Sequence, residues 1–212
     1  MIFTRRILSL EAVLSLFLLA GCLPKPSPEL LSPWLISDLR LLDPDEAQEP
    51  TQDLIAAYMR QNGEELQIRL DFLEVGRFDE FDLYLALDTG PGGLNELSSL
   101  HTAAQISWDT LLVIPAHGGI KAFSASGDRR AGLAVLVVRD PVTETILISL
   151  NRKELADKIN GFGQWGNVRT QVFLTLAGEK SIVDGLAPFT LDSPPPRPAR
   201  YVLAFWDVFK RL

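Results

Sequence analysis

Residues able to carry enzymatic chemistry are few in this 212-residue chain. It has two histidines, His101 and His117, and one cysteine, Cys22. A zinc or iron site needs clustered His or Cys ligands, and this set supplies none. A Gly-x-Ser-x-Gly elbow is absent, and the Ser-Ala-Ser-Gly run at 124–127 is typical of a turn. A Ser-His-Asp arrangement whose residues are distant in the sequence and meet only in the folded chain stays an alternative. The residue types nevertheless favour a chain that is not an enzyme.

Cys22 ends a segment with the features of an export signal. Arg5 and Arg6 precede a mostly apolar run over 8–20, which leads into Leu19-Ala20-Gly21-Cys22. This ending resembles the lipobox of bacterial lipoproteins, in which the cysteine thiol receives a diacylglycerol and the freed amine a third acyl chain. The alternative is an ordinary buried thiol. We expect a signal peptide at 1–21 and a mature chain exported and held by lipid to a bacterial membrane, facing the periplasm or the cell exterior.

Charge and composition restrict the partners of the mature chain. The full sequence has a formal net charge of −7, and loss of Arg5, Arg6 and Glu11 with the signal peptide makes it −8 (−7 − 2 + 1). This charge disfavours nucleic acid and anionic lipid head groups, because both require a basic patch. With one cysteine no intramolecular disulfide can form, so stability must come from the core. Residues 22–33 contain four prolines and predict a tether. Residues 34–212 then form one domain of ordinary size.

The dominant hydrophobic period in that domain is two, which is the period of a half-buried strand. Residues 66–72 and 81–88 alternate most clearly. Asn62-Gly63 supplies the positive φ angles of a tight turn, so the run at 53–60 should pair antiparallel with 66–72. Only 152–159, with Asn151 as N-cap, reads as a helix.

These segments predict an all-β fold, an antiparallel β-sandwich of jelly-roll or immunoglobulin-like type with about nine strands and one short helix. A parallel α/β fold would need a helix between most strands. The expected strands cover residues 53–60, 66–72, 81–88, 108–115, 120–124, 133–139, 145–150, 168–176 and 201–205.

The order of several segments carries a family resemblance. Asp53 precedes the hairpin that ends in Leu66-Gln-Ile-Arg-Leu-Asp71, followed by Phe81-Asp-Leu-Tyr-Leu-Ala-Leu-Asp88, a Gly-rich loop and Trp108-Asp109. This resembles the β-sandwich modules of the family-9 carbohydrate-binding and DOMON-like group, including those appended to glucodextranase-type enzymes, over roughly 34–205. The resemblance implies glycan binding by a sheet face and its loops, often with aromatic platforms, and in some members structural calcium.

The candidates for such a platform are the four tryptophans, Trp34, Trp108, Trp165 and Trp206, since an indole face covers a pyranose ring well. Core packing is the alternative for each of them. Trp165 and Trp108 are the expected ligand-binding residues, Trp165 because it lies in a Gly-rich stretch typical of an exposed loop. For calcium, which takes several oxygen ligands, the expected residues are Asp43, Asp45 and Asp53. Solvated acidic turns are the alternative there.

The sequence thus predicts a membrane-anchored lipoprotein whose non-catalytic sandwich recognises carbohydrate. One alternative is an envelope scaffold that binds a protein partner through a strand edge or apolar patch. Another is a binding module separated from a catalytic domain. The apolar segment at 201–212 is expected to provide the last strand of the sandwich.

Overall fold

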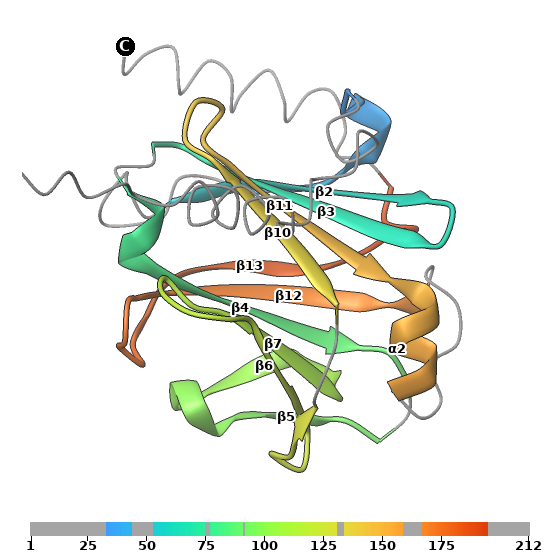
Figure 1. The fold of residues 1–212 in the computed structure, drawn as a ribbon, viewed down its shortest axis with the longest axis vertical. Helices are drawn as coiled ribbons and strands as arrows, with labels where there is room; N and C mark the ends of the chain where they lie inside the picture. Colours follow the sequence, from blue (N-terminus) through green and yellow to red (C-terminus); the bar gives the residue numbers. More distant parts are fainter. Residues whose placement is uncertain are drawn as a thin grey trace, which may run out of the picture.

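The computed structural model describes residues 33–43, 53–74, 77–90, 92–130, 134–158 and 167–194 (Figure 1). In these ranges every strand pairing is antiparallel, which confirms the all-β prediction. The signal peptide, Cys22, Asp45, Trp165 and the strand expected at 201–205 lie outside the described residues.

Sheet A has five strands in the order β1-β2-β3-β11-β10. Leu66, Ile68 and Leu70 of β3 point to one face and are fully buried, as their period-two spacing predicts. The strands are β1 (Leu39–Leu42), β2 (Leu54–Asn62), β3 (Glu65–Phe72), β10 (Val135–Asp140) and β11 (Thr145–Asn151).

Sheet B has six strands in the order β13-β12-β4-β7-β8-β9 and packs on that face of sheet A. Their contact is the main hydrophobic core, to which sheet B contributes Leu83, Leu85, Leu112, Val172 and Leu174 among others. The strands are β4 (Phe81–Asp88), β7 (Thr110–Ile114), β8 (Lys121–Ser124), β9 (Arg129–Arg130), β12 (Arg169–Leu176) and β13 (Ile182–Thr190).

A third layer covers the other face of sheet B. It is a hairpin of β5 (Leu94–Leu97) and β6 (Thr102–Trp108), seen below sheet B in Figure 1. Ile106 and Trp108 of the hairpin pack with Ala86, Leu111 and Phe173 of sheet B in a second hydrophobic cluster. Strands β4 and β12 are therefore largely buried on both faces.

The helical elements in these ranges are short. Helix α2 (Arg152–Lys158) begins after Asn151, whose Oδ1 accepts the Glu154 N–H at 3.2 Å, so the predicted helix and its cap are confirmed. Three 3-10 turns accompany it: η2 (Ile36–Asp38), η4 (Phe78–Glu80) and η5 (Ser98–Leu100). Across the described ranges, no helix combines the length and apolar composition required to cross a membrane.

The structure corrects two local predictions and the strand count. The described ranges hold strands β1 to β13 rather than about nine. Trp108 does not open the strand expected at 108–115: it ends β6, and β7 begins at Thr110. In the β2–β3 hairpin, Asn62 pairs with Glu65 and Gly63 has φ +56°, so the two turn residues are Gly63 and Glu64.

Candidate functional site

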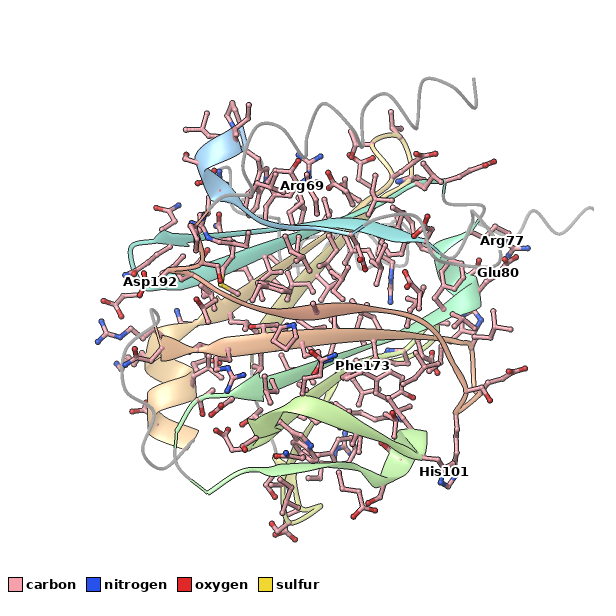
Figure 2. All side chains as sticks on the ribbon, turned by 180° about the vertical axis from the view of Figure 1, so that it is seen from behind. Arg69, Arg77, Glu80, His101, Phe173 and Asp192 are labelled. Carbon is pink, nitrogen blue, oxygen red and sulfur yellow. The ribbon has the colours of Figure 1, made fainter. Side chains whose placement is uncertain are left out.

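Polar and aromatic side chains gather on the outer face of sheet A, the face turned away from sheet B. Strands β2 and β3 alternate, so the residues between their core positions point to this face. We call five of these side chains the outer-face ladder; Figure 2 shows one of them, Arg69, above sheet A. The ladder consists of Trp34, Tyr58, Arg60, Arg69 and Asp71.

Close contacts join the ladder from end to end. The Arg60 guanidinium lies 4.1 Å from the centre of the Trp34 ring, and the Trp34 and Tyr58 rings meet edge to face with centres 6.2 Å apart. Tyr58 is directly opposite Arg69, whose guanidinium lies 5.1 Å from the tyrosine ring centre. Arg69 in turn forms a two-point ion pair with Asp71, at 2.5 and 3.0 Å. Both guanidiniums therefore lie against aromatic rings in cation–π geometry.

A row of hydrogen bonds extends the ladder across sheet A. Arg60 Nε donates to Gln67 Oε1 at 2.8 Å, and Gln67 Nε2 donates to Glu65 Oε2 at 3.1 Å. The same carboxylate oxygen accepts the Ser149 hydroxyl of β11 at 3.0 Å. Arg60 also donates to the Pro33 carbonyl at 3.0 Å. The row fixes the rotamers of the long polar side chains, which lowers the entropy lost when they bind a ligand.

Access to this face is partial. Gln67 and Ser149 are buried, whereas Trp34, Tyr58 and Arg60 are half-buried. The Arg69 and Asp71 side chains are 27% and 16% exposed. Burial raises the pKa of the Asp71 carboxyl, although Arg69 opposes this, and burial lowers the pKa of the Arg60 guanidinium, which Asp38 opposes. The ladder is thus a partly desolvated polar surface, on which hydrogen bonds are stronger than in water.

The indole N–H of Trp34 adds an unsatisfied donor at the end of the ladder. Its nitrogen is buried and has no acceptor among the described residues. A buried donor without a partner costs roughly 1–3 kcal/mol. Aromatic faces, guanidinium donors and a carboxylate acceptor in one row are suited to a ligand with apolar C–H faces and many hydroxyls.

Trp108 does not form a ligand platform. It is 6% exposed in the second hydrophobic cluster, and its Nε1 donates to the Glu96 carbonyl at 3.1 Å. The expectation of an exposed indole is therefore wrong for Trp108, and the core alternative holds, because β6 covers sheet B. Trp165 stays a prediction, since it lies outside the described residues.

Two of the expected calcium ligands can be located. Asp43 follows β1 and is half-buried, while Asp53 precedes β2 and is 1% exposed. Asp45 lies outside the described residues. Within the part of the chain that is described, no three His, Cys, Asp or Glu side chains are grouped so as to hold a metal ion. Calcium binding by the 43–53 segment stays a prediction.

His101 lines an open depression of about 640 Å³, together with Glu96, Ser98, Thr102 and Ala103. Ser98 Oγ donates to Glu96 Oε1 at 3.1 Å, and the hydrogen bond between His101 and Ser98 joins backbone atoms at 3.4 Å. This geometry directs the serine proton to a carboxylate rather than to an imidazole, which is not the nucleophile–base contact of a hydrolase. His117 is exposed in a loop, and 124–127 forms the expected turn.

Sequence reasoning named Trp34 among the four tryptophans but missed Tyr58, Arg60, Arg69 and Asp71. The alternation at 66–72 placed the odd-numbered residues on a wet face, and that was the available signal. The contacts themselves depend on the pairing of β2 with β3. Comparisons with protein-family models and with curated proteins found no match to this chain.

Proposed function

We propose that this protein is a lipid-anchored, non-catalytic lipoprotein of the bacterial envelope that binds carbohydrate through the outer-face ladder. The observation that carries the proposal is the row of Trp34, Tyr58, Arg69 and Asp71 on one sheet face. Rings stack on sugar C–H faces, while the guanidinium and carboxylate bind hydroxyls.

Two further features support recognition at this face. Cation–π contacts and the Arg69–Asp71 ion pair hold the polar groups in place before a ligand arrives, which reduces the entropic cost of binding. The Trp34 ring is half-buried and meets the Tyr58 ring edge to face, so it too is held in place in this row. The lipid on Cys22 would hold this surface at the membrane.

The test is calorimetric titration of residues 23–212 with a panel of oligosaccharides and polysaccharides, with calcium and with chelator. Saturable binding is expected for at least one glycan. Tyr58→Leu and Arg69→Met should each weaken it at least about tenfold, the equivalent of one lost ring or charged contact. If binding is seen with calcium and lost with chelator, the calcium prediction is supported.

Two control variants locate the site. Trp108→Phe changes a buried ring on the far side of sheet B and should leave affinity unchanged. Trp165→Ala tests the other predicted platform. Loss of affinity in Trp165→Ala, with Tyr58→Leu and Arg69→Met unaffected, would move the site away from the ladder. An absence of binding across the whole panel would contradict the carbohydrate proposal.

Strand β10 favours a second candidate function, a scaffold for a protein partner. It is the end strand of sheet A, and Val135, Leu136, Val137 and Val138 are all half-buried. Such an apolar edge can receive an added strand from another chain. Val137→Pro would remove a backbone donor from this strand. If an envelope protein that co-purifies with the wild type is lost in Val137→Pro while glycan binding is retained, the scaffold function is supported.

A further inference from the structure

Large apolar side chains that are strongly exposed are few in the described residues, and most of them lie on one side of the molecule. Leu35 is 61% exposed, Ile36 73% and Val142 89%. Leu35 and Ile36 belong to the start of η2, and Val142 to the turn between β10 and β11. Leu94, at 49%, lies apart from them on β5.

Both segments project beyond sheet A on the side of its outer face. In Figures 1 and 2, η2 and the β10–β11 turn stand above sheet A, while β5 lies at the opposite end of the molecule. The two segments therefore flank the outer-face ladder. Neighbouring exposed apolar side chains such as Leu35 and Ile36, with Val142 on the same side, are typical of a surface that contacts another apolar phase.

The chain enters the domain at this side. Pro33 is the first described residue, and Arg60 binds its carbonyl at 3.0 Å, so the described chain starts next to Leu35 and Ile36. A Pro-rich segment with the length of residues 23–33 spans about 35 Å when extended, at roughly 3.1 Å per residue. A lipid on Cys22 would thus hold η2 within reach of the bilayer surface.

We infer that Leu35, Ile36 and Val142 contact the lipid bilayer and orient the outer-face ladder toward the membrane. The inference rests on the lipid anchoring in the proposed function. It also narrows the ligand class, because a sugar bound between these two segments would be one carried at the same membrane surface. Asp140 and Glu144 flank Val142 in the sequence, so contact with zwitterionic lipid is favoured over contact with anionic lipid.

The test uses the full lipidated protein in vesicles of phosphatidylcholine. Cys22 is the one cysteine of the chain and its sulfur would carry lipid, so a new cysteine can be labelled alone. Leu35→Cys and Val142→Cys place a polarity-sensitive nitrobenzoxadiazole dye at the two segments, and Leu94→Cys is the matched control on β5. Exposed sites tolerate such changes. Quenching by doxyl-labelled lipids then reports contact with the bilayer.

The expected result is a blue-shifted dye emission, quenched by the doxyl lipids, at positions 35 and 142 but not at 94. Protein that floats with the vesicles yet shows equal, unquenched emission at all three positions would overturn the orientation and leave the anchoring intact. A blue shift without quenching would mean that a protein surface covers these residues, and it would also overturn the inference. Protein that fails to float would overturn both the anchoring and the inference.

Discussion

The Arg60 guanidinium lies 4.1 Å from the centre of the Trp34 ring and at the same time donates to the buried Gln67 side chain at 2.8 Å. One cation thus joins the first described segment of the chain to the middle of sheet A. Arg60 binds the Pro33 carbonyl as well, so it holds the residue at which the described chain starts against sheet A.

Replacing Arg60 should therefore destabilise the fold and loosen the attachment of the first described segment to sheet A. We expect Arg60→Met to lower the free energy of unfolding by about 1–3 kcal/mol, since a cation–π contact is lost and the Gln67 amide loses a donor while buried. Urea denaturation followed by circular dichroism measures this. Arg77→Met is the control, because the Arg77–Asp79 pair is exposed and should contribute little. Equal effects of the two changes would contradict the assigned role of Arg60.

Gly93 is required for the close approach of the β4–β5 connection to β6. A Cβ built there would lie 2.1 Å from the Ser107 carbonyl oxygen and 2.5 Å from that of Trp108, both backbone atoms. Gly93→Ala should cost about 1–3 kcal/mol or more, because the hairpin must shift. Gly119→Ala meets nothing within 4 Å and should be close to neutral. Near-ultraviolet circular dichroism of Trp108 and the urea midpoint would show the difference.

Asp82 holds two loops at one end of sheet B. Its Oδ1 accepts the Ala116 N–H at 2.7 Å and its Oδ2 accepts the Gly178 N–H at 3.0 Å. Asp82→Asn puts an amide N–H₂ against one of these donors, so we expect a loss of about 1–3 kcal/mol. Hydrogen exchange should speed up at Ala116 or Gly178, whichever faces the new amide. Unchanged exchange at both would rule out this role.

Asp71 and Asp79 should give opposite pH dependences. Burial raises the pKa of Asp71 above its ordinary 3.8, so the folded state holds its proton to higher pH than the unfolded state does. The contribution of Asp71 to the free energy of unfolding should thus be largest below pH 3.8 and fall as pH rises above it.

Asp79 provides the comparison of opposite sign. Its hydrogen bond with Arg77 lowers its pKa, so its contribution is present above pH 3.8 and is lost as pH falls. The difference in unfolding free energy between wild type and Asp71→Asn should decrease with pH, and that for Asp79→Asn should increase by a smaller amount, because the Asp79–Arg77 pair is exposed. Slopes of the same sign in urea titrations across pH would refute the assignment for one of the two carboxyls.

Alternation of apolar residues was sufficient to predict β3, β4, β11 and β12, because each has large aliphatic side chains on its core face. Strand β6 alternates too, with Ala104, Ile106 and Trp108 buried, but its small and polar residues gave a weak signal. Strand β13 contains Gly185 and Pro188, residues that strands disfavour, and it forms at the end of sheet B through pairing with β12.

The contacts of the candidate site depend on the register between β2 and β3, which composition alone does not predict. With Asn62-Gly63 as the two turn residues, Tyr58 would have faced Gln67. The observed turn at Gly63-Glu64 places Tyr58 opposite Arg69 instead. A one-residue change in the turn shifts the partner by two residues on the same face, so the polar character of the face could be predicted but its contacts could not.

The hairpin of β5 and β6 has a consequence for how this protein can vary. It buries the far side of sheet B, so β4 and β12 accept few substitutions on either face without loss of packing. Most side chains of the outer-face ladder are less restricted, because they pack on one sheet face only; Arg60 is the exception, since it also holds Gln67 and Pro33. Sequence variation, whether by natural drift or by library selection, can therefore be concentrated on the outer face of sheet A while the rest of the domain is left unaltered.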